Sequence, residues 1–415
     1  MNCFRLTATL ESPVAIKRDR QSERSEGVRS IGGTLLRGAL ATVYLQQHGV
    51  ADDSFGRLFL DENRCRYGPL DPADRVFPQT AAACKREGIG HGLVDLLWFR
   101  LAQQWVAGVL PEEAEQAWRQ CRMCKADIKN RTGFWYDANG QVREAERDRR
   151  TVAAHVGIDR VTSTAAESVF YTLEAMAPGD RDADLFGWLA ADDETRTTLE
   201  ELLASEDHVV YVGHHRTRGY GGVRLSIGES VEPPDEPQLF QAWDRWSESL
   251  IAFLTASPFR IDGLDAEGDF FFSLSLPNGA ILLDDVLRYT LDPTAMEKWL
   301  PPLPDPTDVR PVKDRPFQTL ASGGALQCVT AVAKHERVRG WNTAHGLPRH
   351  DEWGLMRGTV YTYWFRGTRQ ERQQLKTGLR QLSDAGIGIR RNEGFGVVQV
   401  SDDFHSRFCR QEEQR

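Results

Sequence analysis

The chain has 415 residues, of which 40% are hydrophobic and 27% charged, a composition typical of globular proteins with buried cores. The net charge of −9 argues against indiscriminate nucleic-acid binding, and no apolar run approaches the roughly 18 residues of a membrane helix. Because Arg5 and Glu11 interrupt the apolar N-terminus, no signal peptide is predicted. We expect a cytoplasmic protein of two or three domains, with reduced cysteines and no membrane association.

The N-terminal segment predicts a strand, a basic loop and a helix. Apolar and polar side chains alternate at residues 4–10, which is typical of a half-buried strand. Residues 17–29 are polar and basic, so we expect an exposed loop there. Apolar side chains recur at helical spacing in residues 31–45, and we expect Thr34 to cap this helix and Gly49 to end it.

Residues 50–150 predict an insertion in the first domain. They contain four of the seven cysteines and several glycine and proline breaks. Helical patterns occur near 92–107 and 112–120, and a charged connector follows at 143–150.

A proline-rich, acidic stretch at 229–238 predicts a linker between two domains. We therefore expect a first domain at 1–228, including the insertion, and a second domain at 239–415. Further helices are predicted at 194–204, 239–254 and 375–382, and further strands at 208–212, 223–227, 270–276 and 397–400.

Two glycine-rich loops repeat one pattern, Arg-x-x-Gly-aromatic-Gly-x-Val-x-aliphatic. One copy begins at Arg216 and the other at Arg391, and each follows a predicted helix and precedes a predicted strand. Copies this far apart indicate two related domains rather than a solenoid. Glycines let the backbone approach a ligand closely, and arginines donate to phosphates or bases. The alternative is a pair of tight turns in which Tyr220 and Phe395 only fill the core; Phe395 is expected to pack inward in either case.

Cysteine spacing predicts a metal site in the insertion. Cys121 and Cys124 have the C-x-x-C spacing that lets two thiolates bind one zinc ion. Cys84 and His91 lie upstream as further ligands, with Cys65 as the alternative to His91. Four protein ligands leave no position for water, so the zinc is expected to be structural. The alternative is a set of buried cysteines without a metal.

Several stretches, taken together and in order, resemble one protein family. They are I-G-G-T-L-L-R-G-A-L at 31–40, P-x5-C-K at 78–85, H-G-L-V-D at 91–95, C-R-M-C at 121–124, I-D-R-V-T-S-T-A at 158–165, G-W-N-T-A-H-G-L-P-R at 340–349 and the two glycine-rich loops. The chain resembles the RAMP superfamily of CRISPR-associated proteins, and in particular the Csx-type RAMP subunit of type III-D effector complexes.

The resemblance implies an α+β fold of two ferredoxin-like (RRM/RAMP) domains, with the zinc-binding insertion in the first. It implies a non-catalytic subunit that caps an antiviral type III complex and binds the 5′ handle of the crRNA. The implied partners are the large polymerase-like subunit and the backbone RAMP subunits.

Basic, glycine and aromatic residues of the loops are the expected RNA contacts. They are Lys17, Arg18, Arg20, Arg37, Arg160, His215, Arg216, Arg218, Gly219, Tyr220, Gly221, Arg390, Arg391, Gly394, Phe395 and Gly396. Because Glu393 stands where the first loop has Arg218, the second loop is expected to bind RNA less well or to contact protein.

Two other functions remain open. Some RAMP proteins cleave precursor RNA with a histidine, and His214 or His215 could act as the general base of such an endoribonuclease. The acidic net charge would also suit a protein scaffold without RNA contact.

Overall fold

The computed structural model describes residues 1–16, 24–25, 29–105, 112–145, 150–158, 160–179, 184–205, 207–256, 258–292, 299, 326–342 and 345–409. Lys17, Arg18 and Arg20, and most of the predicted basic loop, lie outside these residues. Among the described helices, none is long and apolar enough to cross a membrane.

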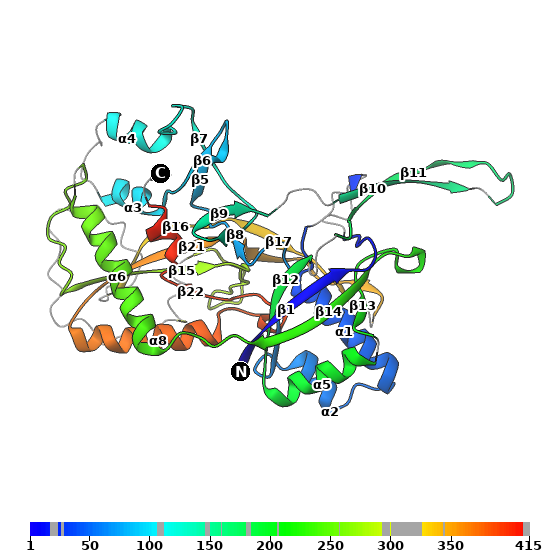
Figure 1. Ribbon diagram of the computed structural model, residues 1–415. Helices are drawn as coiled ribbons and strands as arrows, with labels where there is room; N and C mark the ends of the chain where they lie inside the picture. Colours follow the sequence, from blue (N-terminus) through cyan, green and yellow to red (C-terminus); the bar gives the residue numbers. More distant parts are fainter. Residues whose placement is uncertain are drawn as a thin grey trace.

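The first half of the chain contains a five-stranded antiparallel sheet (Figure 1). Its order is β13 (Val209–Tyr211), β14 (Gly222–Ser230), β1 (Asn2–Leu10), β12 (Leu185–Ala191) and β3 (Cys65–Tyr67). Helices α1 (Gly33–His48) and α5 (Asp193–Ala204) bury their apolar side chains against it in one core. The alternation predicted for the first strand is confirmed, because the even-numbered residues from Phe4 to Leu10 are buried.

The second half contains a four-stranded sheet that is buried on both faces. Its order is β16 (Leu326–Val332), β21 (Thr359–Arg366), β15 (Asp269–Leu276) and β22 (Gln399–Val400). Helix α8 (Arg369–Ala385) packs on one face, and α6 (Glu236–Thr255) contributes to the cores on both. All eight residues of β15 are buried, which explains its nearly continuous apolar sequence.

Of the insertion predicted at 50–150, the part from β4 (Arg75–Val76) onward packs against the second half of the chain, whereas its first residues, up to Leu70, belong to the core of the first sheet. This part contains two three-stranded sheets. One has the order β4, β8 (Phe134–Ala138) and β9 (Gln141–Glu144). The other has the order β6 (Gly88–Asp95), β5 (Ala81–Cys84) and β7 (Ile128–Asn130). Helix α4 (Glu112–Arg119) follows α3 (Leu97–Trp105), whose Trp98 packs edge-on against Trp246 of α6 with ring centroids 5.8 Å apart. Phe77 and Trp135 share a core with Phe404 of α9 (Asp403–Arg407). The insertion therefore depends on distant segments for its burial.

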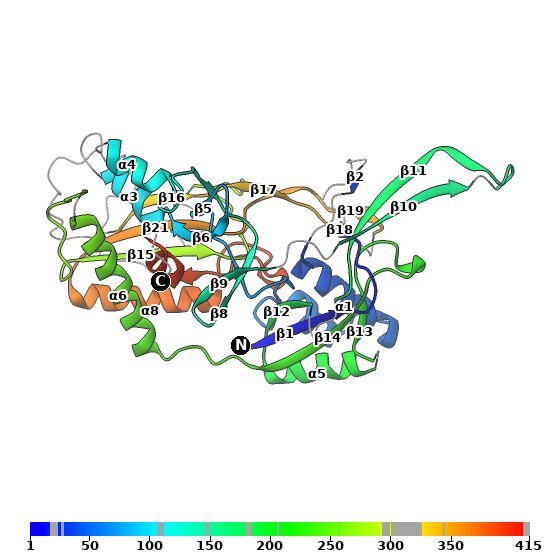
Figure 2. The ribbon, with the colours of Figure 1, turned by 45° about the horizontal axis from the view of Figure 1, so that its top comes forward.

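Two β-hairpins extend from the sheets (Figures 1 and 2). The longer one consists of β10 (Arg150–Ile158) and β11 (Ala165–Met176), to which the short β2 (Arg24–Ser25) adds in parallel. The other is built from β17 (His335–Val338) and β20 (Glu352–Leu355), with β18 (Trp341–Asn342) and β19 (Leu347–Pro348) beyond them. Figure 2 shows the long hairpin projecting away from the rest of the molecule.

Two predicted element boundaries are wrong. The helix expected near 92–107 begins only at Leu97, because the carboxylate of Asp95 ends strand β6 and accepts the Leu97 N–H at 2.6 Å. Thr34 does not cap α1; Gly32 is the N-cap residue, and the Thr34 hydroxyl donates to Glu393 instead. The end of α1 is as predicted, with Gly49 in a left-handed conformation.

The short elements between these are mostly single turns. They are α2 (Asp53–Phe55), the π-helical turn η1 (Gly56–Leu60), and the 3₁₀ turns η2 (Arg216–Arg218) and η3 (Arg391–Glu393), which form parts of the two glycine-rich loops.

Candidate functional site

Four predicted metal ligands lie together in the insertion. Cys84 ends β5, His91 lies in β6, and Cys121 and Cys124 follow α4. Their ligand atoms are all within 4.8 Å of one another. The Cys84 and Cys124 sulfurs are 3.5 Å apart, and the Cys121 sulfur is 3.7 Å from His91 Nδ1. A tetrahedral ion with bonds of about 2.0–2.3 Å holds its ligand atoms roughly 3.5–3.8 Å apart, so the spacing suits a metal ion.

Local electrostatics favour a thiolate at Cys84. The backbone N–H of Glu87 donates to its sulfur and, together with that of Arg86, lowers the pKa of Cys84 to about 6. The Ala126 N–H also favours a thiolate at Cys124, but burial and the neighbouring Cys84 and Cys121 sulfurs outweigh it and raise the pKa of Cys124. A metal ion would stabilise both thiolates and remove this competition.

Cys65 is not part of this cluster. It lies in β3, opposite Ala191 of β12, and is fully buried in the core of the first sheet. Burial raises the pKa of its thiol to about 12, so it is a core residue that stays protonated. Of the two alternatives for the fourth ligand, the structure places His91 at the cluster.

The first glycine-rich loop presents two arginines on the surface. His215 has a left-handed backbone, Arg216–Arg218 form one 3₁₀ turn, and both arginines are exposed. Gly221 has φ of 94°, and a Cβ atom there would lie 2.4 Å from the Val212 carbonyl oxygen. Only glycine therefore fits at position 221.

Aromatic rings from the long hairpin lie beside this loop. The rings of His155 and Tyr171 are parallel, with centroids 5.1 Å apart, and the His215 ring lies 6.3 Å from that of Tyr171 at a similar tilt. Arg218 donates to the Tyr171 hydroxyl at 2.6 Å. Tyr220 instead packs, half-buried, against Ala15 and two residues of β11. The middle of the hairpin and the loop thus form one surface of rings and cations, which we call the ring–arginine surface (His155, Tyr171, His215, Arg216 and Arg218).

Arg160 lies away from the ring–arginine surface. It is exposed in the turn between Ile158 and Ala165, at the far end of the hairpin. The same hairpin exposes apolar side chains on its other face. They are Val152, Val156, Ile158 and Phe170, of which Phe170 is 69% exposed.

The second loop has the backbone of the first but a different environment. Arg390 is left-handed, Arg391–Glu393 form a 3₁₀ turn, and Gly394 and Gly396 have positive φ. The loop packs against the first half of the chain: a Cβ atom on Gly33 of α1 would lie 2.4 Å from the Glu393 carbonyl oxygen. Phe395 is half-buried, with the Arg390 guanidinium over its ring at 5.4 Å.

Glu393 gathers the arginines around this loop. Its carboxylate is 2.6 Å from Arg37 and 2.9 Å from Arg349, and it also pairs with Arg390. Burial alone would raise the pKa of Glu393, but Arg390 and Arg37, with the Thr34 hydroxyl, lower it to about 2.

The other arginines near the second loop are also paired within the chain. Arg390 contacts Glu352 as well as Glu393, and Arg391 pairs with Glu62. The ion pairs Arg37–Glu393 and Arg391–Glu62 therefore join the two halves of the chain, whereas the ion pairs of Arg390 lie within the second half.

Sequence reasoning missed His155 as a member of the ring–arginine surface. The sequence shows only that His155 lies in a segment of alternating polarity. That it lies opposite Tyr171 follows from the pairing of β10 with β11. It also missed a buried chain of Ser275, His405 and Asp95. The Ser275 hydroxyl is 3.0 Å from His405 Nε2, and His405 Nδ1 is 2.9 Å from Asp95. All three are buried, so they connect β15, α9 and the insertion.

A family model described as the RAMP superfamily matches residues 7–224, just over half of the chain. The chain belongs to the RAMP superfamily. The matched residues span the whole ring–arginine surface, the metal-ligand cluster and the first glycine-rich loop. The resemblance drawn from the sequence motifs is confirmed at the level of this superfamily.

Comparison with solved structures gives distant matches to this RAMP protein. A chain of the type III-B Cmr-beta complex bound to cognate target RNA and AMPPnP is 11% identical, with a TM-score of 0.37 and coverage of 86% of each chain. Cmr4 from Pyrococcus furiosus is 13% identical, with a TM-score of 0.25, and the match covers 56% of this chain and 100% of Cmr4. No curated protein is similar enough in sequence to match.

Proposed function

We propose that this RAMP protein is a non-catalytic, RNA-binding subunit of a type III-D-like CRISPR effector complex that holds the 5′ handle of the crRNA. The ring–arginine surface carries the proposal. Exposed Arg216 and Arg218 offer phosphate contacts, and Tyr171 and His155 offer flat rings on which splayed bases can stack. This combination suits single-stranded RNA better than a duplex, whose bases are already stacked.

The strand orders support two ferredoxin-like domains. In chain order the first half has β1, α1, β3, β12, α5 and β14, and its sheet has the order β14-β1-β12-β3. The second half places β22, β15, β21 and β16 in the same relative order. We assign the domains to residues 1–228 and 239–415, joined at 229–238.

Binding by the two loops is unequal in this proposal. Arg216 and Arg218 of the first loop are exposed, whereas Arg390 and Arg391 are paired with carboxylates. The first loop, with Gly219, Gly221 and the hairpin residue Arg160, is therefore the RNA-binding one. The second loop positions the two halves of the chain.

The metal proposed for the insertion is a structural Zn²⁺. Three cysteines and one histidine are a donor set that zinc prefers, and four protein ligands would close the site to water. The cluster ties the β5–β6 hairpin to the segment after α4 and would add stability to an insertion with few core residues of its own.

The handle assignment is tested with the assembled complex. Complexes are reconstituted with crRNA that carries its repeat-derived 5′ handle, or with the same RNA carrying a scrambled handle of equal length and composition. We expect preferential assembly on the intact handle and a footprint of this subunit at the 5′ end. Equal assembly on both RNAs, with no footprint there, would overturn the proposal.

A metal-independent endoribonuclease is the second candidate. The observation that favours it is that the rings of His155 and His215 lie near each other, with centroids 6.4 Å apart. Two neighbouring histidines could serve as the general base and the general acid of RNA cleavage. Incubation of precursor crRNA with the protein in EDTA decides between the two. Cleavage that is lost in the His214→Ala/His215→Ala variant would favour the enzyme, whereas intact RNA favours the binding subunit.

A further inference from the structure

The outer edge of the first sheet is only partly covered. Strand β13 pairs with β14 from Gly222 to Arg224, and the Leu225 N–H donates to the His208 carbonyl at 2.8 Å. Beyond this point no strand of the described residues lies along the outer side of β14. Because backbone groups alternate between the two sides of a strand, the N–H and carbonyl of Ile227 face the same outer edge as those of Leu225.

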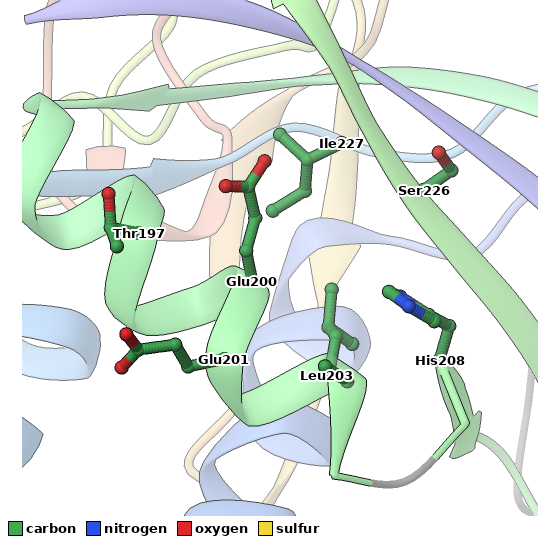
Figure 3. Close-up of a pocket in the computed structure, with 8 residues that line it drawn as sticks. Thr197, Glu200, Glu201, Leu203, His208, Ser226 and Ile227 are labelled. Atoms are coloured by element: carbon green, nitrogen blue, oxygen red, sulfur yellow. The ribbon is translucent and has the colours of Figure 1, made fainter.

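A groove of about 390 Å³ lies along this uncovered edge, between β14 and α5 (Figure 3). Leu203 of α5 and Ile227 of β14 give it an apolar floor. Figure 3 shows the Glu200 side chain extending toward Ile227, with His208 at the other end beside Leu203. The groove thus combines a free strand edge, an apolar floor and a carboxylate.

The surroundings of the groove are acidic. Helix α5 carries Asp193, Glu194, Glu200 and Glu201, and its one basic residue, Arg196, is 2.8 Å from Glu200. Glu229 of β14 and Asp207 are also exposed. Phosphates would be repelled here, so the groove does not suit RNA and favours a positively charged partner.

We infer that this edge binds an extended, basic segment of a partner protein, which adds a strand to β14 in line with β13. Main-chain hydrogen bonds to Ile227 would supply affinity, and the groove would supply selectivity. Alternate residues of the added strand face the groove. A residue over Leu203 and Ile227 would be apolar, and the residue two positions away, near Glu200, would be lysine or arginine. The inference does not depend on the RNA proposed above.

The test uses a fluorescein-labelled peptide, Lys-Thr-Val-Thr-Lys-Thr-Val-Thr-Lys, with the full-length protein in the absence of RNA. Its lysines and valines share one face of a strand. A peptide with glutamates in place of lysines controls for charge. A lysine peptide N-methylated at alternate residues on one edge keeps the charge but loses the donors of that edge. Fluorescence anisotropy measures binding, and amide hydrogen exchange of residues 225–230 reports strand addition.

We expect the lysine peptide to bind at least tenfold more tightly than either control and to slow amide exchange at Ile227. The Glu200→Gln/Glu201→Gln variant should weaken binding about three- to tenfold, since two negative charges that line the groove are lost. The variant Glu248→Gln/Glu267→Gln removes two exposed glutamates elsewhere and should bind like the wild type. Circular dichroism checks that both variants are folded.

Three results would overturn the inference. The first is that the lysine peptide does not bind even at millimolar concentration. The second is that the N-methylated peptide binds equally well, which would indicate charge attraction alone. The third is that amide exchange in residues 225–230 is unchanged when the peptide is bound. Each leaves the RNA proposal untouched, because RNA is absent from the assay.

Discussion

His215 and Arg390 occupy equivalent positions in the two glycine-rich loops and have the same left-handed backbone, with φ of 61° and 60°. Each is followed by one 3₁₀ turn and a left-handed glycine, Gly219 or Gly394. The duplicated sequence thus produces a duplicated backbone. The environments differ: His215 lies beside the half-buried ring of Tyr171, whereas Arg390 is paired with Glu393 and Glu352. One loop is therefore available to a ligand, and the other holds the protein together.

Removal of the exposed arginines should weaken RNA binding. We expect Arg216→Ala/Arg218→Ala to lower the affinity for single-stranded crRNA and to reduce the salt dependence by about two counterions, since each lost phosphate contact removes roughly one. Filter binding at several salt concentrations measures both. The control Arg57→Ala/Arg64→Ala removes two exposed arginines that pair with Glu194 and Asp192, and it should leave the salt slope unchanged. Identical slopes for all three proteins would exclude the loop from the RNA site.

Substitution of the cluster cysteines should remove a stoichiometric amount of zinc. Cys121→Ser/Cys124→Ser should lose about one zinc per chain and lower the melting temperature, because metal binding contributes to folding. Metal analysis of the purified protein and thermal unfolding measure the two effects. Cys65→Ala should retain the zinc, because this residue lies in another core. Full stability of the double variant, with no zinc in the wild type, would leave only unliganded cysteines.

Glu393 predicts acid sensitivity. Its pKa is about 2 in the folded protein and about 4.5 ordinarily, so its contribution to stability is present above pH 4.5 and is lost as the pH falls toward 2. Glu393→Gln removes the buried carboxylate that Arg37, Arg349 and Arg390 share, and it should lower the free energy of unfolding at pH 7 by about 3 kcal/mol. Urea unfolding at pH 7 and pH 4 measures this.

An exposed ion pair provides the control for Glu393. Glu11 pairs with Arg224 at 2.6 Å, but both side chains are more than 40% exposed. Glu11→Gln should therefore change the stability by less than about 1 kcal/mol. An equal effect of the two substitutions would show that Glu393 does not join the two halves of the chain.

The buried His405 should make the stability of the protein depend on pH in the opposite direction to Glu393. Burial opposes its protonation, but Asp95, with Asp402 and Asp403, raises the pKa of His405 above its ordinary 6.5. The stability that this histidine contributes is present below pH 6.5 and is lost as the pH rises through the folded pKa. We expect His405→Gln to be less stable at pH 6 and to lack this decline. The control His208→Gln changes an exposed histidine and should keep the wild-type profile; a wild-type profile in His405→Gln would contradict the assignment.

Features that depend on neighbours in the chain could be predicted from the sequence. The two loops were recognisable because the left-handed turns require glycines at fixed spacing, and strand β15 because burial on both faces demands a continuous apolar run. Cys121 and Cys124 were recognisable as candidate metal ligands because two thiolates at C-x-x-C spacing can form half of a tetrahedral site. Superfamily membership followed from the order of such local motifs.

Only the tertiary structure decided which of these groups remain free to act. His91 rather than Cys65 completes the cluster, because the pairing of β5 with β6 brings His91 near Cys84, whereas β3 holds Cys65 in another sheet. Arg37 and Arg391 looked as available as Arg216 in the sequence, but carboxylates from distant segments neutralise them. Charge pairing and burial depend on which segments meet in space, and the spacing of residues along one chain does not contain that information.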